Sequence, residues 1–239
     1  MKTVLITGAN KGIGFEAAKQ MAQLGYFVYV GSRDRVRGLQ AVNKLKSSGI
    51  SSVELIEIDV TSIESIRRAR QELETKMEAL DVLINNAGIA GEQPQNMSSG
   101  SIENLRRVFE TNFFGAVQTT QQFIDLMKKS DGPRIVNVSS GLGSLTAHSN
   151  TTDSPNLGMF DAYSCSKTAL NAFTVMLAGE FRGTKFTINS VGPGYTATDL
   201  NGHRGTQTVE EAARRVVKYA TIGNDGPTGG YFKDEAIPW

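Results

Sequence analysis

The sequence predicts an α/β fold built on a parallel β-sheet that is covered by helices on both faces. Short apolar segments rich in β-branched residues alternate along the chain with longer segments in which apolar residues recur at helical spacing. The expected strands are apolar almost throughout, which is typical of a parallel sheet with both faces buried. We expect the helical segments to form right-handed crossovers between neighbouring strands.

The elements follow one another in regular alternation. The expected strands are Val4–Ile6, Tyr26–Val30, Val53–Ile58, Leu80–Ile84, Ile135–Val138, Phe186–Val191 and a short last strand at Gly229–Phe232. The expected helices are Ile13–Leu24, Val36–Lys46, Ile63–Met77, Ile102–Phe109, Phe113–Met127, Ala162–Phe181 and Thr208–Tyr219. Two polar segments, Glu92–Ser101 and His148–Leu157, are too short for interdomain linkers. We therefore expect a single domain over residues 1–239.

Composition excludes several classes of protein. The 239 residues carry 25 Lys and Arg against 24 Asp and Glu, so the net charge of +1 gives no basis for binding nucleic acid or a membrane surface. A hydrophobic content of 39% excludes a disordered chain, and the single cysteine excludes a disulfide scaffold. No apolar run is long enough to span a bilayer. These counts favour a soluble, cytoplasmic globular protein.

The two histidines, His148 and His203, lie in polar segments without a cysteine or acidic partner at ligand spacing. We therefore expect no metal site.

A glycine-rich turn connects the first expected strand to the first expected helix. Its three glycines, Gly8, Gly12 and Gly14, have the spacing Gly-x3-Gly-x-Gly, which differs from the commoner Gly-x-Gly-x-x-Gly. Glycines allow a sharp turn and a close approach of the backbone to a ligand, and a helix N-terminus favours negative charge. The turn therefore predicts a site for the pyrophosphate of a dinucleotide. Glycines that serve packing alone remain the alternative.

The end of the second strand indicates which dinucleotide is bound. Arg33 can form paired hydrogen bonds with a phosphate, and Ser32 stands where a carboxylate would repel one. Lys11 in the glycine-rich turn can add a second positive charge. These residues favour NADPH. In the alternative interpretation Arg33 and Asp34 form a solvated pair, or Asp34 binds the ribose of NADH.

Tyr163 and Lys167 are four residues apart in an expected helix, so their side chains share one face. A nearby ammonium favours the phenolate and would lower the tyrosine pKa from its usual value of about 10. The tyrosine could then exchange a proton with a carbonyl or alcohol oxygen. Cys165 faces elsewhere on the helix, and we expect its thiol to be buried.

With these motifs the chain resembles the short-chain dehydrogenase/reductase family over nearly its whole length. The matching motifs, in family order, are Thr7-Gly8-x3-Gly12-x-Gly14, Asp59-Val60, Asn85-Asn86-Ala87-Gly88, Asn112, Ser139-Ser140, Tyr163-x3-Lys167 and Pro193-Gly194. Within the family, the segments Asn10–Gly14, Ser32–Asp34 and Thr111–Gly115 are similar to those of NADPH-dependent carbonyl reductases.

The resemblance implies a fold and a catalytic set. The fold is a Rossmann-type doubly wound sheet of about seven parallel strands in the order 3-2-1-4-5-6-7, with the cofactor across the switch point. Tyr163 would be the general acid, and Lys167 would lower its pKa and bind the nicotinamide ribose. Ser140 would orient the substrate carbonyl. Asn112 would hold a water that connects Lys167 to solvent.

The resemblance also implies a cofactor site that runs along the carboxyl ends of the strands. Its expected residues are Gly8, Asn10, Lys11, Gly12, Ile13, Gly14, Ser32, Arg33, Asp59, Val60, Asn86, Ala87, Gly88, Tyr163, Lys167, Pro193, Gly194, Thr196 and Thr198. Some of these positions have structural alternatives. Asn86 and Pro193-Gly194 could be turn residues, Ser140 a solvated loop residue, and Asp59 a helix N-cap in competition with Thr61 or Ser62.

The resulting hypothesis is an NADPH-dependent carbonyl reductase for ketones or aldehydes of modest size and apolar character. A dehydrogenase for 3-oxoacyl thioesters, steroids or polyols is the enzymatic alternative, and an NADP-sensing protein without catalysis is the other. Ser140 and Tyr163 are further apart than is common in the family, and the extra residues coincide with His148–Leu157. That insertion slightly favours a monomer over a homo-oligomer.

The substrate end of the site is the least constrained by the sequence. We expect Tyr195–Gly205 to form a lid over the substrate, because it contains Gly202 and Gly205 and lacks periodicity. The expected pocket wall consists of Leu142, Met159, Phe160, Tyr195 and Leu200.

Overall fold

The computed structural model describes residues 1–150 and 159–239, so most of the expected loop His148–Leu157 lies outside the described residues. Its centre is a seven-stranded parallel sheet with the order β3-β2-β1-β4-β5-β6-β7. The strands are β1 (Thr3–Ile6), β2 (Phe27–Ser32), β3 (Val53–Glu57), β4 (Val82–Asn85), β5 (Arg134–Val138), β6 (Thr187–Val191) and β7 (Tyr231–Phe232). The predicted fold class and strand order are confirmed.

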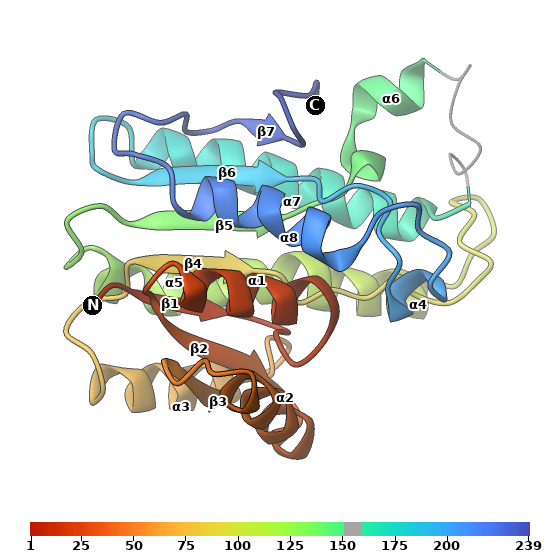
Figure 1. Ribbon diagram of the computed structural model, residues 1–239. Coiled ribbons are helices and arrows are strands. Elements are labelled where there is room, and N and C mark those ends of the chain that lie inside the picture. The colour runs from red at the N-terminus through yellow and green to blue at the C-terminus, as the bar shows by residue number, and fades with distance from the viewer. Residues whose placement is uncertain (151–158) are drawn as a thin grey trace.

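Helices cover both faces of the sheet (Figure 1). One face packs against α1 (Gly12–Gln23), α2 (Arg35–Ser47) and α8 (Val209–Ala220). The other packs against α3 (Ile63–Glu74), α5 (Gly115–Met127) and α7 (Asp161–Glu180), and α4 (Ile102–Phe109) lies against α7. A short helix that the sequence analysis did not expect, α6 (Leu145–Ser149), follows the end of β5.

The two apolar cores explain the continuous apolar character of the strands. In β1, Val4 and Ile6 belong to the core under α1, α2 and α8, whereas Leu5 between them belongs to the core under α3, α5 and α7. Successive side chains of a strand point to opposite faces, so a strand that is covered on both sides is apolar at most of its positions.

A series of hydrogen bonds between buried polar side chains crosses the sheet on the side of α5 and α7. The Asn85 amide nitrogen donates to the Asn137 side-chain oxygen at 2.8 Å, and the Asn137 amide nitrogen donates to the Thr174 hydroxyl at 2.9 Å. The Thr174 hydroxyl lies 2.7 Å from the Ser190 hydroxyl. Thr174 belongs to α7 and the other three belong to β4, β5 and β6. The chain of hydrogen bonds therefore fixes α7 on the sheet.

The connections at the carboxyl ends of the strands gather along one edge of the sheet (Figure 1). The glycine-rich turn follows β1, and the chain beyond β6 forms a bridge between Thr196 and Gln207 and a 3-10 turn at Asp199–Asn201. One irregularity in this region was not predicted: residues Glu110–Phe114 form a π-helix between α4 and α5.

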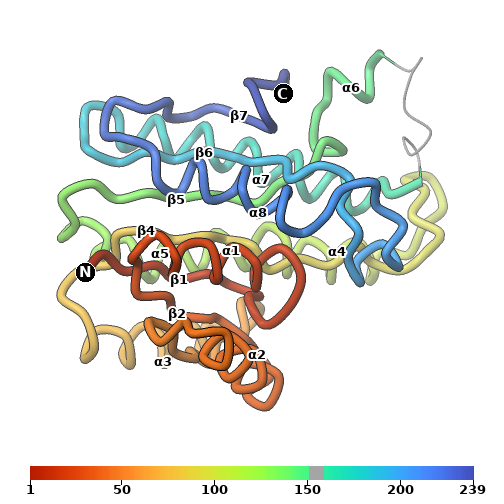
Figure 2. Tube along the Cα trace, viewed as in Figure 1, coloured from red at the N-terminus to blue at the C-terminus, as the bar shows by residue number. Residues whose placement is uncertain are grey.

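The last residues fold back over the same end of the molecule. After β7 the chain reverses, with an antiparallel bridge between Phe232 and Ala236. The final residues reach the start of α6, where the Thr146 N–H donates to the Trp239 carbonyl oxygen at 2.8 Å (Figure 2). Ser144 adds a hydrogen bond from its hydroxyl to the Pro238 carbonyl oxygen, also at 2.8 Å.

Among residues 1–150 and 159–239, no helix combines the length and the apolar character that crossing a membrane requires.

This series of buried hydrogen bonds leads to a prediction about stability. Asn137→Ala removes two hydrogen bonds and leaves the polar groups of Asn85 and Thr174 buried without these partners. The free energy of unfolding should fall by about 1 to 3 kcal/mol, because two buried hydrogen bonds are lost while Asn85 and Thr174 keep those to Thr120 and Ser190. Urea denaturation followed by circular dichroism measures the change. An unchanged midpoint and slope would show that the chain of hydrogen bonds does not stabilise the fold.

Candidate active site

The glycine-rich turn is clamped to the loop after β4. The Asn86 side-chain amide donates to the carbonyl oxygens of Thr7 and Gly8, at 2.9 and 3.1 Å. The buried Thr7 hydroxyl accepts from the backbone N–H groups of Asn86 and Ala87. Asn86 therefore holds the loop after β4 against the glycine-rich turn and is not simply a turn residue.

Two of the glycines are required by this close approach. Gly8 adopts φ +63°, a left-handed conformation, and a Cβ there would lie 2.9 Å from the Ala87 Cα. At Gly14 a Cβ would lie 2.4 Å from the Asn86 amide nitrogen. The glycines at positions 8 and 14 therefore reflect contact with the loop after β4. It also leaves the N-terminus of α1 at the cleft, as a pyrophosphate site requires.

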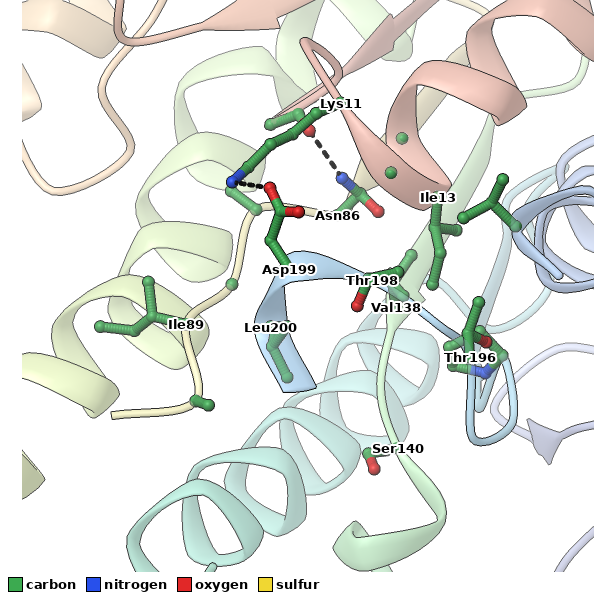
Figure 3. Close-up of a pocket in the computed structure, with 18 of the residues that line it drawn as sticks. Lys11, Ile13, Asn86, Ile89, Val138, Ser140, Thr196, Thr198, Asp199 and Leu200 are labelled. Carbon is green, nitrogen blue, oxygen red and sulfur yellow. Dashed lines mark hydrogen bonds and ion pairs between the residues drawn. The ribbon is translucent and has the colours of Figure 1, made fainter. Parts of the chain in front are cut away.

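One large cleft of about 1430 Å³ runs along the carboxyl edge of the sheet. It is lined by every residue that the sequence analysis placed at the cofactor, and by Ser140. Figure 3 shows the arrangement, with Lys11 and Asp199 at one end of the cleft and Ser140 at the other. The structure thus brings together residues spread from Gly8 to Thr198.

Three of the expected catalytic residues meet at the inner end of this cleft. Tyr163 and Lys167 share a face of α7, with the Lys167 Nζ 5.6 Å from the centre of the Tyr163 ring. The Tyr163 side chain faces that of Ser140 across the cleft, and Ser140 comes directly after Ser139 at the end of β5. Ser139 is only 2% exposed, whereas Ser140 is half-buried and faces the cleft.

Burial sets the protonation of the tyrosine and the lysine. Burial raises the pKa of the Tyr163 phenol, and the hydrogen bond with Ser140 opposes this by lowering it. We expected Lys167 to be the main influence on the pKa of Tyr163, but in the structure burial has the largest effect. Burial also lowers the pKa of Lys167 to about 8. The phenol is therefore a protonated donor at neutral pH, and the amine beside it still carries a proton.

Asn112 lies behind the cleft wall and is 1% exposed. Its side-chain oxygen accepts from the Ile89 N–H at 2.8 Å, and its amide nitrogen donates to the Ile89 carbonyl at 2.9 Å and to the Ser166 hydroxyl at 3.0 Å. A Cβ at Gly88 would lie 3.4 Å from the Asn112 side-chain oxygen and 3.6 Å from the Lys167 nitrogen. Asn112 is thus close to Lys167, held there by the π-helix. A water at this position stays a prediction.

The outer end of the cleft is rich in cationic side chains. Arg33 is exposed at the rim and Ser32 is buried beside it. Arg37, which the sequence analysis did not select, also lines the cleft and lies 3.3 Å from Asp34. The Asp34 carboxylate caps α2 by accepting from the Arg37 N–H at 3.0 Å. Among the described residues Arg33 has no such carboxylate partner within 4.0 Å.

Lys11 occupies a position that the sequence did not predict. Its Nζ lies 2.6 Å from an Asp199 carboxylate oxygen, so an ion pair joins the glycine-rich turn to the expected lid (Figure 3). The other Asp199 oxygen lies 2.8 Å from the His203 ring nitrogen. The hydrogen bond from Lys11 holds the pKa of Asp199 below its usual value, and the hydrogen bond from His203 acts in the same direction.

The opposite end of the cleft has an apolar wall. All five expected wall residues line it: Leu142, Met159, Phe160, Tyr195 and Leu200. Sequence reasoning missed Ile89 and Ile237. Ile89 directly follows the Asn85–Gly88 motif and could have been found from it, but nothing in the sequence indicated that the C-terminal segment reaches the cleft.

One sequence interpretation needs correction, and one alternative that the sequence left open is resolved. Cys165 is exposed and not buried as predicted, because it lies on a different face of α7 from Tyr163 and Lys167. Asp59 is not the N-cap of α3, because Ser62 accepts the capping hydrogen bond from the Ser65 N–H. The Asp59 carboxylate instead accepts from the N–H and the hydroxyl of Thr61 and lines the cleft.

Comparison with known proteins agrees with this geometry. Residues 2–208 match the family described as short chain dehydrogenase. Salutaridine reductase from Papaver bracteatum is 33% identical over 97% of this chain and 94% of its own length. (+)-Neomenthol dehydrogenase from Capsicum annuum is 32% identical over 95% of this chain and 94% of its own length. The solved structure of an NADPH-bound carbonyl reductase from chicken fatty liver covers 100% of this chain and 99% of its own, with 25% identity and a TM-score of 0.86.

The chain therefore belongs to the short-chain dehydrogenase family and is an oxidoreductase. The resemblance that its motifs indicated is confirmed.

Proposed function

We propose that this chain is an NADPH-dependent carbonyl reductase for apolar ketones or aldehydes, with Tyr163 as general acid. The observation that carries the proposal is the meeting of the Tyr163 phenol, the Ser140 hydroxyl and the Lys167 amine at the apolar end of a dinucleotide-sized cleft. A protonated phenol and a neighbouring cation suit protonation of a carbonyl oxygen. The alcohol–ketone chemistry named in the similar plant proteins is consistent with it.

The cofactor is NADP(H), and we propose how the residues of the cleft would hold its parts. The α1 N-terminus and the glycine-rich turn would bind the pyrophosphate, and Asp59 and Val60 would border the adenine. Arg33 at the rim would bind the ribose 2′-phosphate. Bound NADPH would supply hydride from its nicotinamide ring to the carbonyl carbon.

The side chains of the protein handle the proton and the oxygen. Ser140 donates its hydroxyl hydrogen to the substrate oxygen and orients it toward Tyr163. Tyr163 gives its phenolic proton to that oxygen as negative charge develops there. Lys167, held by the Val138 carbonyl oxygen at 2.8 Å, stabilises the resulting phenolate. The apolar wall excludes water from the reacting carbonyl and favours a substrate with an apolar body.

An activity panel tests the proposed function. Loss of NADPH absorbance would be followed with alicyclic ketones, aromatic aldehydes, a 3-oxoacyl thioester and a keto sugar. We expect the highest kcat/KM with the alicyclic or aromatic compounds. A preference for the thioester or the sugar would favour the alternative dehydrogenases, and NADPH binding without turnover of any compound would favour a sensor.

Arg33 should determine the preference for NADPH. Arg33→Ala removes the cation expected to bind the 2′-phosphate, so KM for NADPH should rise by roughly tenfold or more while KM for NADH stays nearly constant. Initial rates with each cofactor measure the change. Arg35→Ala is the matched control, since Arg35 is exposed nearby but is paired with Glu57 and does not line the cleft. Equal changes for the two cofactors would remove Arg33 from this role.

Reduction should also slow at high pH. The pKa of Lys167 is lowered to about 8, so this amine is charged below that pH and loses its charge above it. The pKa of Tyr163 is raised, so the acid itself stays protonated across this range. The kcat/KM for carbonyl reduction should therefore fall as pH rises through about 8. A profile that stays flat to pH 10 would contradict a requirement for the charged amine.

A further inference from the structure

A second buried phenol lies next to the proposed catalytic group without lining the cleft. Tyr231, the first residue of β7, is 2% exposed. Its hydroxyl donates to the backbone carbonyl oxygen of Ser140. Tyr231 is absent from the residues that line the cleft, and its hydrogen bond to Ser140 is the contact through which it reaches the proposed catalytic set.

The backbone of Ser140 depends on few contacts. The carbonyl oxygen that accepts from Tyr231 also accepts from the Gly143 N–H at 2.8 Å. The preceding residue is held by β6, through a 2.8 Å hydrogen bond from the Ser139 N–H to the Val191 carbonyl. Past Ser140 the chain leaves the sheet. Once the backbone is fixed, a single torsion decides where the Ser140 hydroxyl points.

Asn171 connects this turn to the helix that carries Tyr163 and Lys167. Asn171 lies on the same face of α7, one turn beyond Lys167, and its amide nitrogen donates to the Gly143 carbonyl at 3.2 Å. Burial raises the pKa of the Tyr231 phenol far above its usual value, and nearby Tyr163 raises it further, whereas Asn171 acts to lower it. The Tyr231 hydroxyl therefore stays protonated and remains a donor.

The C-terminal segment holds the Tyr231 ring in place. The ring of Trp239 stacks on it, with 5.5 Å between centroids and 22° between planes. The Ile237 N–H donates to the Tyr231 carbonyl oxygen at 2.8 Å. The same segment is attached to the turn after Ser140 through Ser144 and Thr146. Figure 2 shows this return of the chain from β7 toward α6.

We propose that Tyr231 is a positioning residue for carbonyl reduction, which sets the distance between the Ser140 hydroxyl and the Tyr163 phenol by holding the Ser140 carbonyl. This inference rests on the proposed function. Tyr231 touches neither substrate nor cofactor. Its loss should slow the chemical step without weakening the binding of NADPH.

The first test is Tyr231→Phe, which removes the hydroxyl and keeps the ring. We expect kcat to fall roughly tenfold, with the dissociation constant of NADPH unchanged. Tyr219→Phe is the matched control, because Tyr219 is also a buried tyrosine and stacks on Phe232, but it does not line the cleft. An unchanged kcat for Tyr231→Phe, or an equal loss for Tyr219→Phe, would overturn the proposal.

A double-mutant cycle with Ser140→Ala separates positioning from general stabilisation. If Tyr231 acts through the Ser140 hydroxyl, Tyr231→Phe should change kcat by less than about twofold once that hydroxyl is absent. If the loss of kcat in the double variant equals the product of the losses in the two single variants, Tyr231 acts by another route and the proposal is overturned. Thermal unfolding of each variant shows whether the fold is retained.

Trp239→Ala provides a second route if Tyr231→Phe does not fold. It loosens the Tyr231 ring but leaves the hydroxyl, so kcat should fall by roughly two- to fivefold, and should not fall in the Ser140→Ala background. A loss that persists in that background would contradict the proposal. If the unaltered protein reduces no compound of the carbonyl panel, the proposed function fails and this inference with it. If the unaltered protein reduces carbonyls normally and the effects of Tyr231→Phe and Ser140→Ala are independent, only the inference about Tyr231 fails.

Discussion

The site depends on one buried ammonium group. Lys167 is 3% exposed, and its nitrogen donates to the carbonyl oxygen of Val138, the last residue of β5. Burying a charge is costly unless hydrogen bonds compensate, and here the cost is visible as a pKa lowered to about 8. The position is useful because it puts a cation beside the Tyr163 ring, where a phenolate would form.

That arrangement requires α7 and β5 to be fixed relative to each other. The hydrogen bonds of Thr174 to Asn137 and Ser190 attach α7 to the strands β5 and β6. The hydrogen bond from Asn171 to Gly143 attaches α7 to the turn that follows Ser140. The carboxyl ends of parallel strands meet at one edge, so the same geometry gathers the glycine-rich turn and the segment after β6. The cleft then runs from a cationic rim at Arg33 to an apolar wall at the substrate end.

Much of this could be predicted because it is encoded locally. Strand and helix periodicity gave the element order, and the glycine, Tyr163 and Lys167 motifs identified residues that line one cleft. The choice of Ser140 over Ser139 agrees with their exposure. The roles of these residues in catalysis remain predictions.

What could not be predicted depends on contacts between distant parts of the chain. Tyr231 and Ser140 are 91 residues apart, and Lys11 and Asp199 are 188 apart. No local pattern specifies such pairs. The π-helix around Asn112 was also missed, because one extra residue in a helical turn hardly alters the apolar periodicity. The exposure of Cys165 depends on which helix face the rest of the fold leaves uncovered.

The most direct test of the account is hydride transfer by the Tyr163→Phe variant. The rate of NADPH oxidation in a single turnover would be measured with the best carbonyl substrate, together with NADPH affinity by fluorescence titration. Without the phenolic proton the rate should fall by roughly 10³-fold or more, while the affinity for NADPH stays within a few-fold of the original. A variant that binds NADPH and still reduces the carbonyl at a comparable rate would contradict the claim that Tyr163 is the acid.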